Sequence, residues 1–154
     1  MTNILALDLG TTSGIAMSIN GKIKSYSKSF KATRFQSADM RYENFERHLY
    51  VILKEFNILT GIDRVYYEEV RRHIGTDAAH CYGGFKAILT TFCSKNNISY
   101  DTAGVGTIKK HITGKGNANK EKVIKAVQEL GHNPKDDNEA DAIALLYYAI
   151  NIES

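Results

Sequence analysis

The chain of 154 residues is 43% apolar and 24% charged, which predicts one compact domain over residues 1–154 with a single core. Its net charge of +3, from 20 basic and 17 acidic residues, does not by itself indicate a partner. No apolar run approaches the roughly 20 residues of a membrane helix and no signal-peptide pattern opens the chain, so we expect a cytoplasmic protein without a membrane partner.

The N-terminal segment predicts three strands in an antiparallel meander. Residues 3–9 are apolar and run into the turn-forming residues 10–14, after which residues 15–19 form a second apolar run. Asn20 and Gly21 are the strongest short signal for a hairpin, and the alternating residues 22–30 then predict the third strand.

The middle of the chain predicts a helix, a strand and a second helix. From Asp39 to Phe56 apolar residues recur at steps of four and three, which indicates an amphipathic helix that Gly61 ends. The β-forming residues of 63–70 predict a fourth strand, parallel to the first. Apolar residues at helical spacing then predict a helix over residues 77–94.

Two glycines and two cysteines lie in the segment 77–94. Gly83 and Gly84 each cost about 1 kcal/mol in a helix relative to alanine, so we expect close packing against another backbone there, which a second subunit could provide. Cys81 and Cys93 lack the spacing of a zinc site, and we expect both to be buried thiols without a disulfide.

The last third of the chain predicts a short strand over residues 98–102, a helical turn over 107–113 and two further helices. Asn119 can cap the first of these, which runs to Gly131, and the last begins near Asp136 or Asp137. The expected order is βββαβαβαα. The fold class is therefore α/β, with a five-stranded mixed sheet, made of the meander and two parallel strands, flanked by helices.

Acidic residues lie in two of the strands. Asp8 is in the first strand between apolar residues, with no neighbouring charge to neutralise it, so its carboxylate must be solvated or paired. Glu68 and Glu69 lie in the fourth strand on opposite faces of the sheet, and one of them should join Asp8.

The last helix carries two more carboxylates. Asp137 and Asp141 are four residues apart and share one helix face, with Asn138 beside them. Carboxylates from two adjacent strands and a packed helix would repel one another severely without a cation, for which Mg²⁺ is the natural choice and Mn²⁺ a substitute. Two such ions stabilise both the attacking and the leaving oxygen in phosphodiester hydrolysis. The alternative is that each acid only caps or solubilises its own element.

The segment from Lys109 to Lys125 holds six lysines and one glutamate. Such a segment suits a polyanion, although a merely solvated face is the other interpretation.

These pieces together resemble the RuvC Holliday-junction resolvases of the retroviral-integrase/RNase H superfamily. The resemblance rests on LALDLGTTSGIA, YYEEV, GTIKKHITGKGNANKEKV and DDNEADAIAL, in that order over nearly the whole chain. It implies an RNase H-like fold and a magnesium-dependent endonuclease, in which metal-activated water attacks a phosphodiester of a four-way or other branched DNA. Symmetrical cutting implies a homodimer, for which helix 77–94 is our candidate face. The chain looks like the small phage-type branch.

The resemblance also implies roles for the acids. Asp8, Glu68 and Asp141 would be metal ligands, since the family has E-x-V at the strand glutamate. The family usually has D-x-x-D in the last helix, whereas this chain has Asn138 three residues before Asp141. Either Asp137 substitutes from a neighbouring helical position, which we prefer, or Asn138 is a neutral ligand.

Two lysines, Lys109 and Lys120, match family lysines that act at the scissile phosphate by stabilising its charge. The residues expected to contact DNA are Arg71, Arg72, Lys109, Lys110, Lys115 and Lys120. Arg71 falls where better-known resolvases carry an aromatic wedge, so we expect relaxed sequence preference.

Other functions remain open. The segment DLGTTSG also resembles the first phosphate loop of the actin, Hsp70 and sugar-kinase superfamily, although those proteins need two such lobes and this chain has the length of one. A junction-binding protein whose catalytic set has decayed at Asn138 is a second alternative, and a general RNase H is a third. The sequence indicates neither a cutting motif nor an accessory motor.

Overall fold

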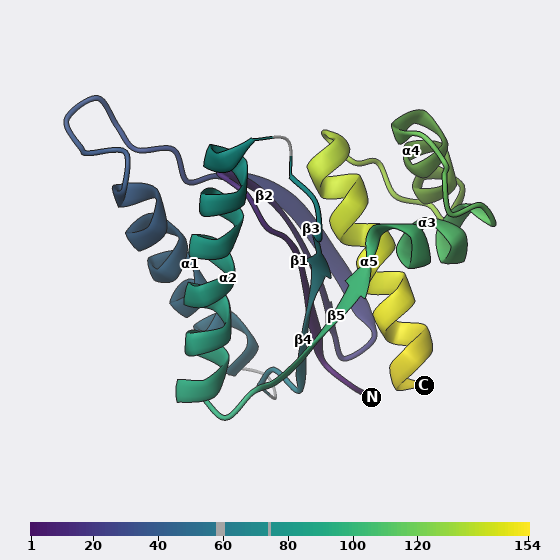
Figure 1. Cartoon of the computed structure of the whole chain (residues 1–154). Helices are drawn as coiled ribbons and strands as arrows, with labels where there is room; N and C mark the ends of the chain where they lie inside the picture. Colours follow the sequence, from purple (N-terminus) through teal and green to yellow (C-terminus); the bar gives the residue numbers. More distant parts are fainter. Residues whose placement is uncertain (58–60, 74) are drawn as a thin grey trace.

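The structure is a computed structural model that describes residues 1–57, 61–73 and 75–154. Within these residues the strands are β1 (Ile4–Asp8), β2 (Thr12–Ile19), β3 (Lys22–Ser29), β4 (Arg64–Glu69) and β5 (Ser99–Gly104). The helices are α1 (Met40–Asn57), α2 (Thr76–Lys95), α3 (Val105–Thr113), α4 (Lys120–Glu129) and α5 (Asp137–Glu153). Together they form one sheet with helices on both sides (Figure 1).

The sheet has the order β3-β2-β1-β4-β5. Strands β1, β2 and β3 pair antiparallel, while β1 pairs parallel with β4 and β4 with β5. The predicted mixed sheet, an antiparallel meander plus two parallel strands, is thus confirmed. The match includes the predicted parallel alignment of the fourth strand with the first.

Two predicted boundaries were wrong, and a third lies partly outside the described residues. Strand β2 begins at Thr12, because the turn after β1 is closed at once by the Ser13 hydroxyl, which donates to the Gly10 carbonyl at 2.8 Å. The helical turn expected over 107–113 is a full helix that begins at Val105, so the order is βββαβαβααα. Helix α1 extends to Asn57 in the described part of the chain, and three of the residues between it and the expected end at Gly61 lie outside the described residues.

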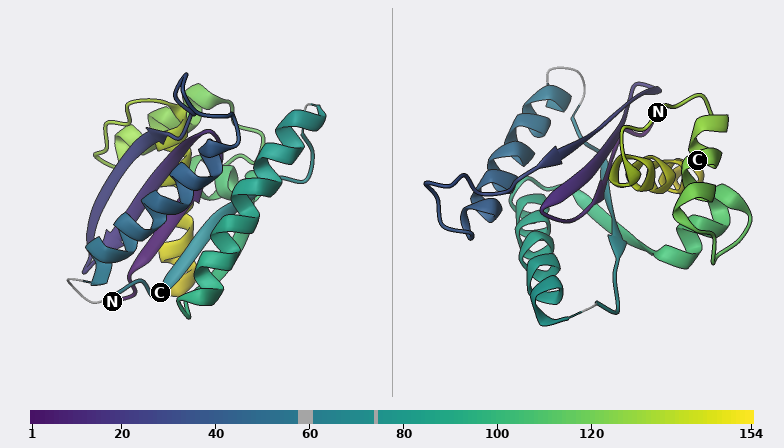
Figure 2. Two further views of the ribbon diagram at one scale, coloured as in Figure 1. Left: turned by 90° about the vertical axis from the view of Figure 1, so that its left-hand side faces the viewer. Right: turned by 90° about the horizontal axis from the view of Figure 1, so that it is seen from above.

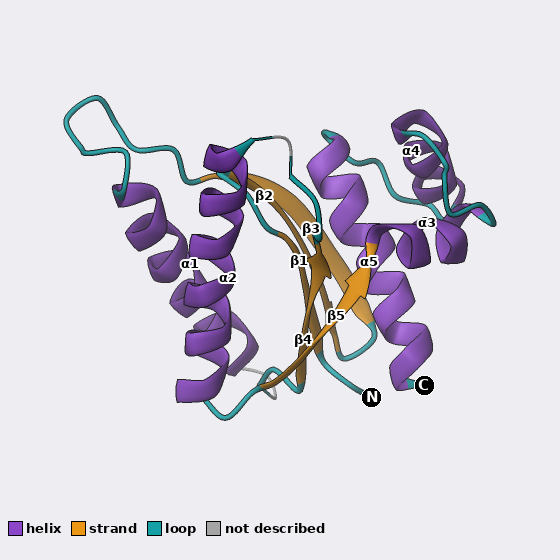
Figure 3. Ribbon diagram, in the orientation of Figure 1, coloured by secondary structure: helices purple, strands orange, loops and turns teal. Residues whose placement is uncertain are grey.

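Helices α1 and α2 cover one face of the sheet, and α5 covers the other, with α3 and α4 packed beside it (Figures 2 and 3). Large side chains fill the α1/α2 face, where the ring centroids of Phe45 and Phe85 lie 4.9 Å apart. The α5 face carries small residues where the helix crosses the strands, among them Ala6, Ala16 and Ala142. The helix therefore approaches the strands closely on that face alone.

Gly14 of β2 marks the closest approach. A methyl group placed there would lie 1.8 Å from the backbone oxygen of Asn138, in the first turn of α5. Because Gly14 pairs with Asp8, this contact sets the N-terminal end of α5 against the end of β1.

The glycines and cysteines of α2 differ from expectation. A methyl group on Gly84 would meet the ring of Tyr42 at 2.4 Å, so this glycine admits a side chain of α1 rather than another backbone. Gly83 is exposed and has no atom within 4 Å of such a methyl group. Both cysteines are free as predicted, but only Cys93 is buried, because Cys81 lies near the exposed start of α2 and is half-buried. In the described residues no helix combines the length and apolar character needed to cross a membrane.

Candidate active site

Strand alternation brings Asp8 and Glu68 to the α5 face of the sheet. Ala6 and Tyr66 face α5, and Asp8 and Glu68 each follow by two residues, which returns the side chain to the same face. Both lie one residue beyond the Leu7 and Tyr67 pair of the two parallel strands. Asp8 is the last residue of β1 and Glu68 the last but one of β4, so both lie near the carboxyl ends of their strands. The other glutamate of the pair, Glu69, faces the opposite side.

Helix α5 brings its acids to the same place because its first turn is fixed to the sheet. The side chain of Asp136 caps the helix by accepting from the Glu139 N–H, and it also accepts from the Ser27 hydroxyl at 2.6 Å. Glu139 is buried and accepts from the Ser25 hydroxyl at 2.7 Å and from the backbone N–H of Lys135. Sequence reasoning missed this attachment to β3, although the D-x-x-E spacing is a capping signal.

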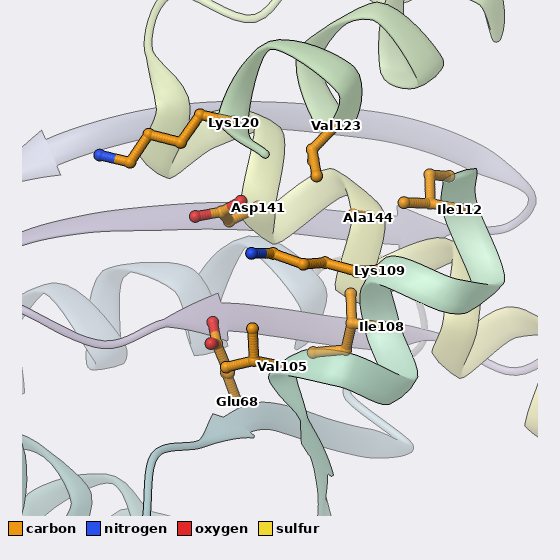
Figure 4. Close-up of a pocket in the computed structure, with 9 residues that line it drawn as sticks. All are labelled: Glu68, Val105, Ile108, Lys109, Ile112, Lys120, Val123, Asp141 and Ala144. Atoms are coloured by element: carbon orange, nitrogen blue, oxygen red, sulfur yellow. The ribbon is translucent and has the colours of Figure 1, made fainter. Parts of the chain in front are cut away.

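A pocket of about 210 Å³ opens beside these acids, between β4, α3, α4 and α5. Its polar lining residues are Glu68, Lys109, Lys120 and Asp141. The other lining residues are apolar and include Ile108 and Val123. Figure 4 shows Lys109 extending from α3 toward the carboxylates of Glu68 and Asp141, with Lys120 approaching from α4. Sequence-distant residues thus meet in one place.

The charge state of Asp8 reflects this crowding. Burial raises the pKa of its carboxyl well above the usual value, and the charges of Glu68, Asp141, Asp137 and Asp136 raise it further. Desolvation alone would disfavour the charged form of an isolated carboxylate in the sheet. Here the repulsion from neighbouring acids disfavours it further.

Glu68 and Asp141 share the same environment. Burial, followed by the charge of Asp141, raises the pKa of Glu68 to about 7, and burial with the charge of Asp137 raises the pKa of Asp141 to about 6. Lys109 opposes both shifts. The carboxylates of Asp8, Glu68 and Asp141 form no hydrogen bond or ion pair with any described residue. Their oxygens are therefore available to a ligand.

Asp137 is held differently. Its carboxylate pairs with the ammonium group of Lys120 at 3.1 Å, at side chains that are 39% and 75% exposed. This hydrogen bond, followed by the charge of Asp137, raises the pKa of Lys120. The two residues expected to act at the phosphate and at the metal thus contact each other, and the side chain of Asn138 has no such partner in the described part of the chain.

The carboxylates of Asp8, Glu68 and Asp141 have the chemistry of ligands for a hard divalent cation, but they are too far apart to form a complete site. Half-buried carboxylates that repel one another, lack hydrogen-bond donors and have raised pKa values are the oxygen ligands that Mg²⁺ takes. Over residues 1–57, 61–73 and 75–154, however, no three Asp, Glu, His or Cys side chains stand close enough together to form a complete metal site. The acids face one region and would need a cation to bring them closer.

Tyr82 of α2 holds the backbone beneath the site. Its hydroxyl donates to the Glu68 carbonyl at 2.8 Å and accepts from the Val70 N–H at 3.3 Å. Sequence reasoning treated Tyr82 only as part of an apolar helix face, because no local pattern shows where a hydroxyl will reach.

The remaining basic candidates lie around the site rather than in it. Arg71 and Arg72 are exposed just past the end of β4, and Arg71 lies 3.7 Å from Glu69. Lys110 and Lys115 are exposed on α3 and on the loop that follows it, and Lys115 lines a separate cavity with Lys122 and Lys125. None of these residues lines the pocket that holds Glu68 and Asp141.

Comparison with known structures shows the same architecture elsewhere. The Thermus thermophilus RuvC structure with a Holliday junction substrate matches with a TM-score of 0.78 and 20% identity, covering 97% of this chain and 95% of that chain. A further Thermus thermophilus RuvC structure matches with a TM-score of 0.76 and 21% identity over 97% and 96% of the two chains. The yeast mitochondrial Holliday junction resolvase matches with a TM-score of 0.60 and 14% identity over 94% of this chain and 75% of that one. These likenesses establish the RNase H-like fold of the resolvases.

Sequence comparison establishes the family. The family model described as crossover junction endodeoxyribonuclease RuvC matches residues 5–149. A protein of that name from Caldicellulosiruptor saccharolyticus is 30% identical over 145 residues, which cover 89% of this chain and 87% of the relative. Of the two resemblances of the DLGTTSG segment, the nuclease one is therefore supported. The chain belongs to the RuvC family of crossover junction endodeoxyribonucleases.

Proposed function

We propose that this protein is a magnesium-dependent endonuclease that resolves four-way DNA junctions and cuts related branched DNA. The observation that carries the proposal is the group of Asp8, Glu68 and Asp141, which are half-buried beside one another without hydrogen-bond donors. A structural role would be served better by one neutralised acid than by three that repel one another. The related Thermus thermophilus protein was solved with a Holliday junction substrate, which supports branched DNA as the substrate class.

The chain's own residues divide into two roles. Asp8, Glu68 and Asp141, with Asp137 as the fourth ligand, would hold Mg²⁺ or Mn²⁺, which when bound supplies Lewis-acid stabilisation of the phosphodiester oxygens. Lys109 and Lys120 hold the phosphate and stabilise the negative charge that develops on it. Arg71, Arg72, Lys110 and Lys115, which are exposed, contact the flanking DNA backbone. The preference for sequence is relaxed, because Arg71 takes the place of an aromatic wedge.

The test is cleavage of a labelled synthetic four-way junction in Mg²⁺, in Mn²⁺ and in a chelator, with duplex, fork, flap and RNA–DNA hybrid substrates in parallel. We expect junction cutting with either metal and none with the chelator. Asp8→Asn should reduce the rate by about 10³-fold or more, since it removes several kcal/mol of transition-state stabilisation, and should leave junction affinity unchanged. Binding without cutting by the wild type would instead identify a decayed junction-binding protein, and a preference for hybrids would identify a general RNase H.

The glutamate pair provides a matched control. Glu68→Gln and Glu69→Gln remove the same charge from neighbouring positions of β4 on opposite faces of the sheet. We expect the first to lose cutting and the second to keep it. Equal effects of the two would refute the assignment of Glu68.

We also propose a homodimer with α2 at its interface, acting in the cytoplasm of a phage-infected or bacterial cell. Exposed Gly83, with open space above it, lets another helix approach closely, which is the contact that a two-fold interface between helices uses. Sedimentation of the purified protein measures this directly, and a monomer at micromolar concentration with full junction cutting would contradict it. The phage-type branch stays a proposal that rests on the DNEAD segment of α5.

A further inference from the structure

A second cavity lies next to the turn that follows Asp8. It has a volume of about 380 Å³, and its lining includes Lys31, Arg41 and three side chains with hydrogen-bonding groups, those of Thr11, Thr33 and Gln36. None of its lining residues is acidic. The cavity therefore combines two positive charges with neutral donors, which is the chemistry of a site for an anion.

Arg41 is the fixed charge of this cavity. Its guanidinium donates to the Thr11 hydroxyl at 3.4 Å, and its carbon lies 5.3 Å from the ring centroid of Tyr42. No carboxylate pairs with it among the residues that the structure describes, and its Nε is buried without a hydrogen-bond partner. An arginine is always charged, so this one is held in place without a counter-ion.

The cavity lies close to β1 because Thr11, one of its lining residues, follows Asp8 by only three residues. The Cα atoms of Thr11 and Asp8 therefore lie within about 11 Å of each other. The Thr11 carbonyl accepts from the Phe30 N–H at 2.7 Å, which attaches the loop bearing Lys31 to the same turn. In Figure 1 this loop, between β3 and α1, and the first turn of α5 lie at the same end of the sheet. A strand of DNA rises about 3.4 Å per nucleotide, so this separation corresponds to about three nucleotides at most.

We infer that this cavity is a subsite for a backbone phosphate of the DNA, within a few nucleotides of the bond that is cut. The inference rests on the proposed function, because it assumes that DNA occupies the acidic site. Lys31 and Arg41 neutralise the phosphate, and the hydroxyls of Thr11 and Thr33 with the Gln36 amide supply hydrogen bonds to its oxygens. The strand is then fixed on the far side of the Asp8 turn from Lys109 and Lys120, which sets its direction across the acids.

The first test measures junction binding in a chelator, so that no strand is cut, over a series of salt concentrations. Each phosphate contact contributes about 0.9 to the slope of log affinity against log salt, which is a five- to tenfold change in affinity near 0.1 M salt. Lys31→Ala should lower the slope by about that amount and weaken binding correspondingly. Lys31 is exposed, so its removal does not threaten the fold.

The controls separate charge from position. Lys54→Ala removes the same charge from an exposed position of α1 and should leave slope and affinity unchanged. Arg41→Gln should behave like Lys31→Ala, and Arg41→Lys should restore most of the slope, which distinguishes a charge effect from disturbed packing.

The second test locates the phosphate. Single neutral methylphosphonates placed along each junction strand should weaken wild-type binding five- to tenfold at one or two positions within about three nucleotides of the cut, and Lys31→Ala should be insensitive at those positions. A cavity for a free anion would instead show thermal stabilisation by inorganic phosphate that Lys31→Ala removes, with no change in the DNA slope, and this would overturn the inference.

The outcomes also separate this inference from the proposed function. If Lys31→Ala and Lys54→Ala have the same slope, the subsite is refuted while cutting by the wild type still supports the nuclease. If the wild type binds with the expected slopes but does not cut in Mg²⁺, the catalytic proposal fails and the subsite stands. Absence of DNA binding by the wild type overturns both.

Discussion

The two faces of the sheet are packed with side chains of different size, and the acidic site lies on the face with the smaller ones. The α1/α2 face is filled by aromatic and long aliphatic residues, which include Phe30, Phe45, Phe56, Phe85 and Phe92. The α5 face also buries larger residues, but it differs in carrying several alanines, namely Ala6, Ala16, Ala103, Ala142, Ala144 and Ala149. Large side chains keep helices at a distance from the strands, whereas alanines and Gly14 let α5 approach them.

This difference separates stability from function. The aromatic face contributes most of the buried apolar area, at about 25 cal/mol for each Å² removed from water. The alanine face contributes less area per residue but determines how near Asp141 comes to Asp8. We therefore expect changes on the α1/α2 face to affect mainly stability, and changes on the α5 face to affect cutting as well.

The largest effect should come from two matched glycine substitutions. Gly14→Ala places a methyl group 1.8 Å from a backbone oxygen of α5, which cannot move alone, so we expect about 3 kcal/mol of lost stability and loss of junction cutting. Gly84→Ala meets only the ring of Tyr42 and gains up to about 1 kcal/mol in helix propensity, so its net effect should be small and cutting should persist. Urea unfolding and the junction assay measure both. Equal losses of cutting activity in the two variants would contradict the expectation that cutting depends mainly on the α5 face.

The next effect concerns pH. Folding raises the pKa of Glu68 to about 7 and that of Asp141 to about 6, so the folded protein binds more protons than the unfolded chain between about pH 4 and 7. The stability from these acids is complete below about pH 4 and is lost as the pH rises toward 7. On the other face, burial lowers the pKa of His48, so its contribution has the opposite sign: it is complete above about pH 6.5 and is lost as the pH falls below that value.

Substituting Glu68 isolates the acidic contribution. In a chelator at pH 7.5, Glu68→Gln should raise the free energy of unfolding by about 2 kcal/mol, since it removes a buried, repelled charge. At pH 5 the gain should shrink, while the His48 effect is common to both proteins and cancels. Unfolding curves at the two pH values give the difference, and a gain that grows toward pH 5 would contradict the sign worked out above.

The smallest effect should follow removal of one hydroxyl. Tyr82→Phe keeps the ring in the α1/α2 layer but leaves the Glu68 carbonyl and the Val70 N–H without their partner, at a cost of about 1 kcal/mol. Because the contact reaches through the sheet to the backbone of Glu68, we expect the maximal cutting rate to fall several-fold with unchanged junction affinity. A fall in affinity alone would show that the hydroxyl does not position Glu68.

Much of this arrangement follows from local patterns. The alternation of β1 and β4 decides which face each acid takes, and the i, i+4 spacing of Asp137 and Asp141 decides that they share a helix face. Strand ends were harder to place, because the apolar and β-forming pattern of residues 3–9 and 63–70 runs one residue past both ends of β1 and of β4. The helical turn predicted over 107–113 was too short, because Gly104 and Gly106 weaken the signal for a helix that begins at Val105.

Contacts between distant segments could not be predicted. Nothing near Ser25 or Ser27 indicates that these hydroxyls bind acids of α5 more than 100 residues later, and nothing near Gly84 indicates the ring of Tyr42. Likewise, the sequence leaves open whether Asp137 or Asn138 completes the acid set. Such contacts depend on how elements pack, and alternation and spacing describe each element alone.

The pair formed by Lys120 and Asp137 has a consequence for how ligands arrive. Each side chain is the counter-charge of the other, so an anion that takes Lys120 leaves Asp137 without its partner, and a cation that takes Asp137 does the same to Lys120. Binding of the anion therefore frees Asp137 for the cation, and binding of the cation frees Lys120 for the anion. Thermodynamic linkage requires the enhancement to be equal in both directions, and at so exposed a pair it amounts to a factor of a few.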